Sequence, residues 1–248
     1  RDLTNNRSDM RRLARYLTNT SIGVVMSGGG ARGYAHVGVL RAMDELNIPV
    51  DYVGGTSMGA LVGGVACCNR GDYVLTRKTV KECAALLGSL PQQLLDVTLP
   101  VLSYTKGNLI NNVAKKAFAL RQIENTPVPF YCICTDITNC RECVAQNGPL
   151  WRFVRGSMSL INLFPPIGDL TSPHPNMLVD GGYCNNVPSD VMCRLFHPNT
   201  VITVNVEGYP DEDTAPVYDT QSGFSLFIKQ TFPRLFGEQI SKSSILQK

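Results

Sequence analysis

The sequence has little net charge and no long apolar run. Among its 248 residues, 23 Lys and Arg stand against 20 Asp and Glu, which leaves a formal net charge of +3. So small a positive excess does not indicate a nucleic-acid-binding protein. No segment has about 18 consecutive apolar residues, so none is predicted to span a membrane. The longest apolar stretch, residues 58–68, suits a buried helix instead.

An initiating methionine is also absent, and the first residues have no signal-peptide character. We therefore expect residues 1–20, which are polar and basic, to be a lead-in from a longer protein with targeting or anchoring segments upstream. The nine cysteines are an odd number and favour reduced thiols in a cytosolic setting over a disulfide framework. A zinc cluster of Cys132, Cys134, Cys140 and Cys143 is the alternative, although strand alternation already accounts for the first pair.

Strand-like and helix-like segments alternate along the chain. The expected strands are residues 22–26, 50–54, 130–135, 177–179 and 200–206. The expected helices are residues 34–46, 58–68, 78–87, 108–120 and 186–196, with residues 151–163 helical or mixed. This alternation predicts an α/β fold whose mostly parallel central sheet carries helices on both faces. Hydrophobic residues make up 44% of the chain, enough for a large core.

The pentapeptide Gly55-Thr56-Ser57-Met58-Gly59 is a G-x-S-x-G motif between an expected strand and an expected helix. A serine in this context lies on a sharp strand-to-helix turn that pushes its hydroxyl out of the fold. The two glycines are needed because larger side chains would collide as the turn closes. The motif predicts Ser57 as a catalytic nucleophile.

A glycine-rich loop follows the first expected strand, at Gly28-Gly29-Gly30-Ala31-Arg32-Gly33. Its backbone N–H groups can converge on an anion beside the positive end of the next helix. The anion is either the oxyanion of acyl transfer or a pyrophosphate, since the loop also spells G-x-G-x-x-G. Asp51 has about the spacing of a ribose-binding acid, but it begins its strand instead of ending it. A purely structural turn is a third alternative. Arg32 is expected to support the loop or to attract an anionic head group.

A serine nucleophile needs a base, and the chain has only three histidines. His36 is expected to pack beside the glycine loop, His174 to face solvent from a loop, and His197 to end a helix away from the site. None is well placed to complete a triad, although His197 remains an alternative.

The preferred base is a carboxylate. Asp180-Gly181-Gly182 directly follows an expected strand, where ligands collect in open α/β sheets. A carboxylate can take the serine proton directly if burial raises its proton affinity. The alternative to a catalytic role is that Asp180-Gly181 forms an ordinary turn. Asp136, which follows another expected strand, is the competing candidate for the base. We rank it second and expect it to have a structural or site-shaping role.

These three motifs, in this order, resemble the signatures of patatin-like phospholipases, and in particular of the neuropathy target esterase and lysophospholipase branch. The resemblance covers residues 12–207. Further segments are similar to that branch: Leu13-Ala14-Arg15-Tyr16-Leu17-Thr18, Thr135-Asp136-Ile137-Thr138, Leu150-Trp151-Arg152 and Phe164-Pro165-Pro166. Ser27 departs from the branch, which tends to carry another glycine there, and this puts the fine shape of the loop in doubt.

The resemblance implies a three-layer patatin-like fold and a Ser57–Asp180 dyad without histidine, with the oxyanion hole supplied by residues 28–33. It implies hydrolysis of lysophospholipids or phospholipids to release a fatty acid, without a cofactor or metal. It also implies upstream regulatory domains and attachment to the cytoplasmic face of a membrane, the endoplasmic reticulum. We expect a catalytic domain over residues 21–207 and a C-terminal extension over residues 208–248.

An acyl chain would need an apolar trench beside the nucleophile. The candidates for its lining are Met58, Met158, Leu160, Ile161, Leu163 and Phe164, with Pro165 and Pro166 stiffening its wall. Ordinary core packing is the alternative for each of them. The aromatic part of the extension, residues 224–236, is expected either on a membrane surface or packed on its own domain. A catalytically silent lipid-binding module and a dinucleotide-binding oxidoreductase remain the alternative functions.

Overall fold

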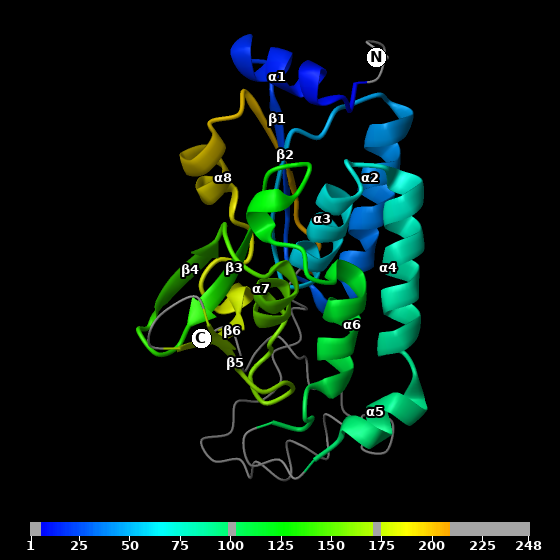
Figure 1. The fold of residues 1–248 in the computed structure, drawn as a ribbon, viewed down its shortest axis with the longest axis vertical. Helices are drawn as coiled ribbons and strands as arrows, with labels where there is room; N and C mark the ends of the chain where they lie inside the picture. Colours follow the sequence, from blue (N-terminus) through cyan, green and yellow to red (C-terminus); the bar gives the residue numbers. More distant parts are fainter. Residues whose placement is uncertain (1–5, 99–102, 171–174, 209–248) are drawn as a thin grey trace. The chain divides into compact units, whose positions relative to one another are not determined.

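The computed structural model describes residues 6–98, 103–170 and 175–208 (Figure 1). Its strands are β1 Ile22–Met26, β2 Tyr52–Thr56, β3 Phe130–Asp136, β4 Arg141–Ala145, β5 Ile167–Asp169, β6 Asn176–Asp180 and β7 Thr200–Val204. Its α-helices are α1 Asp9–Leu17, α2 Ala35–Glu45, α3 Met58–Cys68, α4 Tyr73–Leu87, α5 Leu90–Asp96, α6 Asn108–Phe118, α7 Leu150–Ser157 and α8 Ser189–Phe196.

The strands form one mixed sheet in the order β5-β6-β3-β2-β1-β7, with β4 paired to β3 as well. The neighbours β7-β1-β2-β3 are parallel, as the sequence predicts. The pairs β3–β4, β3–β6 and β5–β6 are antiparallel. The α/β class is therefore confirmed, while the sheet is mixed instead of mostly parallel. Every antiparallel pair involves β4, β5 or β6. The short strands β4 and β5 were not predicted, and neither was the reversed direction of β6.

Side-chain alternation along the strands divides the core into two layers. Val24, Met26 and Cys132 point to one face, where they pack with residues of α2, α3, α4, α6 and α7. The intervening residues Val25 and Tyr131 point to the other face, where α8 covers them. Figure 1 shows α8 on the opposite side of the sheet from α2, α3 and α4. The structure is thus the expected three-layer arrangement, because a strand alternates its side chains between faces.

Helix α3 is buried along nearly its whole length, from Met58 to Cys67. Its small residues explain how the helix can lie so close to the sheet. A Cβ on Gly59 would stand 2.1 Å from the carbonyl oxygen of Met26 in β1. Helix α3 therefore starts immediately behind the strand ends, and it fixes the position of the residue before it, Ser57.

Several boundaries differ from the predicted ones. Helix α8 starts at Ser189 and not at residue 186, because the Pro188 ring disfavours the helical conformation for the residue before it, and Pro188 itself has a non-helical ψ of 51°. Helix α7 ends at Ser157, and the rest of the mixed segment, residues 158–163, is turn-like. All nine cysteines are free thiols, and Cys132 and Cys134, two members of the alternative zinc cluster, are buried in β3. His174 and all but the first residue of the expected C-terminal extension lie outside the described residues.

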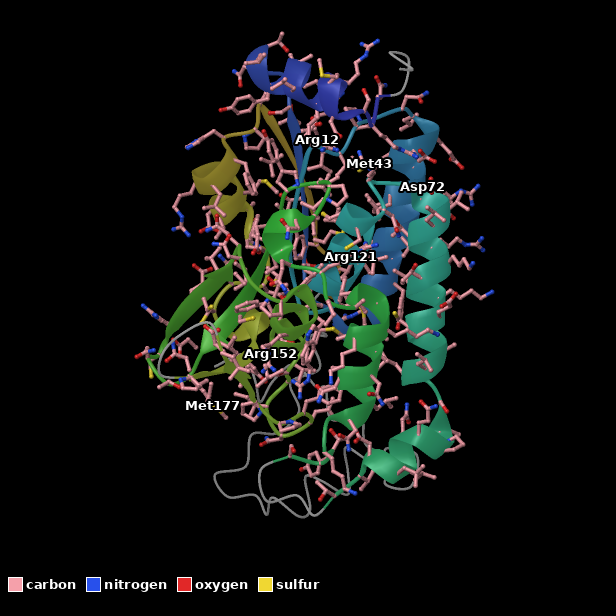
Figure 2. All side chains as sticks on the ribbon, in the orientation of Figure 1. Arg12, Met43, Asp72, Arg121, Arg152 and Met177 are labelled. Atoms are coloured by element: carbon pink, nitrogen blue, oxygen red, sulfur yellow. The ribbon has the colours of Figure 1, made fainter. Side chains whose placement is uncertain are left out.

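Helix α1 lies within the expected lead-in and is anchored to the sheet by Asp51. The Asp51 carboxylate is fully buried and accepts hydrogen bonds from Arg15 at 2.6, 2.9 and 3.0 Å and from the Ile22 N–H at 3.0 Å. Arg12 lies beneath the same helix (Figure 2), 3.9 Å from this carboxylate. Asp51 is therefore occupied at the end of β2 remote from Ser57, which argues against its use as a ribose-binding acid.

We expect Asp51→Asn to lower the free energy of unfolding by about 3 kcal/mol, because it removes one partner of a buried ion pair and leaves Arg15 uncompensated. Urea denaturation followed by circular dichroism measures this loss. The structure around Ser57 should not change, since Asp51 precedes β2 whereas Ser57 follows it. A free energy of unfolding equal to that of wild type would contradict this assignment.

Candidate active site

Two strands meet head-on at one edge of β3, and this meeting brings Ser57 to Asp180. Strand β2 pairs with β3 up to Thr56 opposite Ile133, and antiparallel β6 ends at Asp180 opposite Cys134. Both strands use the same edge of β3, because β4 occupies the other edge over residues 132–136. The residue after β2 therefore faces the last residue of β6. The Ser57 hydroxyl donates a hydrogen bond of 2.7 Å to Oδ2 of Asp180.

Ser57 lies at the sharp turn predicted for a nucleophile. Its backbone has φ 53° and ψ −118°, which a non-glycine residue rarely adopts. The turn is closed by the two flanking glycines, since a Cβ on Gly55 would stand 2.7 Å from the carbonyl carbon of Gly59. Thr56 donates from its hydroxyl to the Asn185 carbonyl at 2.8 Å, which ties the end of β2 to the segment after β6.

Asp180 is buried, with 2% of the residue exposed, and hydrogen bonds hold both its side chain and its backbone. Its Oδ1 accepts from the Gly182 N–H at 2.8 Å, and its own N–H donates to the Ser159 carbonyl at 2.9 Å. Burial raises the pKa of Asp180 to about 6, against the opposing effect of the hydrogen bonds from Gly182 and Ser57. Gly181 is required by close packing, because its Cβ would lie 2.2 Å from the Ile133 carbonyl oxygen.

The glycine loop lies beside Ser57, and Asn186 fixes its first residue. A Cβ on Gly28 would stand 3.1 Å from the Cβ of Ser57. The Gly28 N–H donates to the Asn186 side-chain oxygen at 3.1 Å and to its carbonyl at 3.3 Å. This N–H is therefore engaged. Within the described part of the chain, the next two N–H groups, of Gly29 and Gly30, donate no hydrogen bond.

The rest of the loop leads into α2. Its residues Gly30–Tyr34 form a short 3-10 helix in which Ala31 and Arg32 are exposed. Among the described residues, the Arg32 guanidinium has no ion-pair partner, so it remains available to an external anion. Gly33 packs against Met58, since a Cβ would lie 2.3 Å from that side chain. A larger residue at position 33 would therefore push on the start of α3.

His36 supports the loop from behind and does not reach Ser57. It is fully buried, and its Nε2 lies 2.9 Å from the Ser27 carbonyl oxygen. Because a carbonyl oxygen can only accept, Nε2 carries the hydrogen. Burial lowers the pKa of His36, which keeps the ring neutral at physiological pH. His197 is exposed at the end of α8, so the predicted placement of both histidines agrees with the structure.

Asp136 does not contact Ser57 and instead closes the turn between β3 and β4. Its carboxylate accepts from the backbone N–H groups of Thr138 and Asn139 at 3.1 Å and from the Asn139 side chain at 2.8 Å. Burial alone would raise the pKa of Asp136, but these hydrogen bonds, with that from Arg141, lower it below its usual value. The competing acid therefore has the geometry of a turn-stabilising residue.

The expected trench residues divide into three groups. Met58 and Met158 are buried in the core, whereas Leu160, Ile161 and Leu163 are 37 to 46% exposed just after α7. Phe164 and Pro165 pack around a buried cation, because the Arg155 guanidinium donates to the Pro165 carbonyl at 2.9 Å and lies 6.0 Å from the Phe164 ring. Pro166 is half-buried between them and β5.

Sequence reasoning missed one buried hydroxyl that contacts the backbone of Ser57. The Ser57 N–H donates to Oγ of Ser157 at 2.8 Å, and this hydroxyl donates to the Ile133 carbonyl at 2.6 Å. Asn186 was missed as well. Only folding brings these two residues to the motifs, because their hydrogen bonds join residues 100 and 158 positions apart in the chain.

Comparison with known proteins identifies relatives along most of this chain. The family model for the patatin-like phospholipase matches residues 24–192. Neuropathy target esterase sws of Drosophila melanogaster is 42% identical over 229 residues, which are 92% of this chain and 16% of that protein. Lysophospholipase NTE1 of Mycosarcoma maydis is 43% identical over 226 residues, 91% of this chain and 12% of that protein. The chain therefore spans less than a fifth of the length of these relatives.

Proposed function

The chain belongs to the patatin-like phospholipase family, and from this premise we propose that it is a serine lipid-ester hydrolase. The proposed substrate is a lysophospholipid or phospholipid, from which the enzyme releases a fatty acid. The observation that carries the proposal is the 2.7 Å hydrogen bond from the Ser57 hydroxyl to a buried carboxylate of raised pKa. A Ser–Asp pair of this kind supports nucleophilic catalysis without a histidine.

The first half of the proposed reaction forms an acyl-enzyme. Asp180 Oδ2 accepts the hydroxyl proton while Ser57 Oγ attacks the ester carbonyl carbon. The carbonyl oxygen becomes negatively charged in the tetrahedral intermediate. As the intermediate collapses, the C–O bond to the alcohol breaks, and the proton held on Asp180 passes to the departing alcohol oxygen. A buried carboxylate with a pKa of about 6 is a far better proton acceptor than an exposed one.

The glycine loop is the proposed oxyanion hole, and the hydrogen bonds within the loop narrow the choice of donors. The N–H of Gly28 is already engaged by Asn186, and that of Arg32 donates to the Gly29 carbonyl at 3.1 Å. Among the described residues, the N–H groups of Gly29, Gly30 and Ala31 are the available donors. Each well-placed donor of this kind contributes about 2.7–4 kcal/mol of transition-state stabilisation.

The second half of the reaction hydrolyses the acyl-enzyme. Asp180, again ionised, accepts a proton from a water molecule that attacks the acyl carbonyl carbon. The same loop amides hold the second oxyanion. Collapse of this intermediate breaks the bond to Ser57 Oγ, the proton returns to that oxygen, and the free fatty acid leaves. One carboxylate thus serves as base and then acid in both halves.

The proposed lipid substrate is supported by the family and by the surface near the dyad. Lysophospholipase NTE1 is named for a lysophospholipid-hydrolysing activity, and its match extends over 91% of this chain. The exposed side chains of Leu160, Ile161 and Leu163 follow α7 directly beside Ser159, whose carbonyl holds Asp180. An acyl chain can lie against such apolar side chains. The exposed Arg32 is suited to an anionic head group.

Membrane attachment, an endoplasmic reticulum location and upstream regulatory domains are part of the proposal. They rest on the resemblance to much longer relatives. Among the described residues, no helix has both the length and the apolarity needed to cross a bilayer.

Product analysis on a lipid panel tests the proposed function. The purified protein would be incubated with lysophosphatidylcholine, phosphatidylcholine, triacylglycerol and a cholesteryl ester, and the products identified by mass spectrometry. We expect free fatty acid from the first two lipids, and none from them with Ser57→Ala. Binding of these lipids without any product would indicate a silent lipid-binding module and contradict the proposal.

The pH dependence of the reaction follows from the raised pKa of Asp180. Below a pKa of about 6 the carboxyl group is protonated in the folded protein and cannot accept the Ser57 proton. We therefore expect kcat/KM for a soluble aryl ester to be level above about pH 7 and to fall about tenfold per unit well below pH 6. A steady-state profile from pH 4.5 to 8 measures this, and an acidic limb near the usual carboxyl value of about 4 would contradict it.

A further inference from the structure

The Ser157 hydroxyl occupies a position between two strand ends that no sequence motif assigns. It accepts the Ser57 N–H at 2.8 Å and donates to the Ile133 carbonyl oxygen at 2.6 Å. Ser157 is the last residue of α7 and is fully buried. Its hydroxyl therefore bridges the residue after β2 to β3 at the point where the two strands separate.

The strand register shows what this hydroxyl replaces. Strands β2 and β3 are parallel, and the Val53 N–H donates to the Pro129 carbonyl at 3.0 Å. In a parallel ladder, successive bonds of this type recur every second residue. Four residues further along, the matching pair is the Ser57 N–H and the Ile133 carbonyl. Those two groups do not bond to each other directly, because the Ser157 hydroxyl is inserted between them.

The inserted hydroxyl opens the end of the ladder just where the chain must turn. Ser57 leaves the strand direction with φ 53° and ψ −118°, and its Oγ then reaches Asp180. Without the hydroxyl, the buried Ser57 N–H would lose its acceptor, and the nearest replacement in register is the Ile133 carbonyl itself. Bonding to that carbonyl would draw Ser57 back towards the strand direction and away from Asp180.

The same segment also holds the other member of the pair. The Ser159 carbonyl, two residues after Ser157, accepts the Asp180 N–H at 2.9 Å. The end of α7 thus contacts the backbone of both Ser57 and Asp180. A shift of one relative to the other requires one of these two bonds to break.

We propose that Ser157 is a positioning residue that holds the Ser57 backbone so that its hydroxyl is aimed at Asp180. The inference rests on the proposed hydrolase function and names a further residue for it. Ser157 acts through Ser57 and does not touch the substrate. Its removal should therefore slow the chemical step and leave substrate binding nearly unchanged, since small misplacements of a reacting group cost up to about 100-fold in rate.

The test compares Ser157→Ala, Ser157→Cys and Ser157→Thr with wild type, using p-nitrophenyl butyrate. We expect Ser157→Ala to lower kcat about 10- to 100-fold with KM within about twofold. Ser157→Cys keeps the volume filled but offers only a weak donor and acceptor, so it should show the same direction of loss in a variant without a cavity. Ser157→Thr retains the hydroxyl and should recover most of kcat.

The matched control is Thr126→Val, which removes a hydroxyl bonded to the carbonyls of Ile123 and Val128 before the remote end of β3. It should lower thermal stability without changing kcat. Wild-type kcat in folded Ser157→Ala or Ser157→Cys would overturn the inference, as would a kcat in Ser157→Thr as low as in Ser157→Cys. Failure of the proposed function is distinguishable, because wild type itself would then release no p-nitrophenol above the level of Ser57→Ala.

Discussion

Replacing Ser57 with alanine is expected to lower ester turnover by about 10⁵-fold, to the level set by substrate binding and loop amides alone. The physical reason is that the variant has no oxygen to form the acyl bond, while Asp180 and the loop remain in place. The side chain is small and nearly buried, so its loss creates little space. The measurement is kcat/KM for a soluble ester and for lysophosphatidylcholine, alongside thermal unfolding.

The control for this variant is His197→Asn. His197 is exposed and has φ 46°, a left-handed conformation that asparagine tolerates. We expect it to retain full turnover, because a Ser–Asp pair does not use a histidine. A folded His197→Asn without activity would restore the triad hypothesis, and appreciable turnover by Ser57→Ala would remove Ser57 from the reaction.

The second large effect is expected for Asp180→Asn, which should lower kcat/KM by about 10⁴-fold. An amide cannot accept the serine proton, although it can keep a hydrogen bond to the Ser57 hydroxyl. The comparison variant is Asp136→Asn, which changes the competing acid. Because Asp136 stabilises the β3–β4 turn, this change should reduce stability and leave turnover of the folded protein near wild type. The opposite ranking of the two variants would transfer the role of base to Asp136.

Asp180→Asn should also behave distinctively in stability. Burial raises the pKa of Asp180 from 3.8 to about 6 in the folded protein, so the unfolded chain releases this proton first as pH rises. The carboxylate therefore reduces stability between about pH 4 and 6, by roughly 3 kcal/mol in total. Asparagine does not ionise and escapes this loss. At pH 7 the variant should be at least as stable as wild type, and a marked destabilisation would contradict the burial argument.

The sequence predicts the fold class because its signals are local. The small apolar run 58–68 and the strand 22–26 have the same limits in the structure as in the prediction. Strands β4 and β5 escaped prediction, since β4 is a partly exposed edge strand and β5 has three residues. Their pairing is decided by tertiary contacts that propensity does not encode.

The positions of Ser57 and Asp180 beside their strand ends were predictable, but their contact was not. It depends on β2 and β6 sharing one edge of β3, and β6 runs opposite to the direction a simple βαβ alternation suggests. Ser157 and Asn186 were unpredictable for a related reason. Each is an ordinary polar residue near a helix end, and only the folded chain brings its side chain to Ser57 or to Gly28.

The most direct test is to map the covalent adduct that a fluorophosphonate leaves on the protein. Peptide mass spectrometry of the labelled wild-type chain should locate the phosphonyl group on Ser57 alone, and Asp180→Asn should acquire it far more slowly at the same residue. An adduct on any other side chain, or lipid hydrolysis by a protein whose Ser57 stays unmodified, would show that this hydroxyl is not the attacking group.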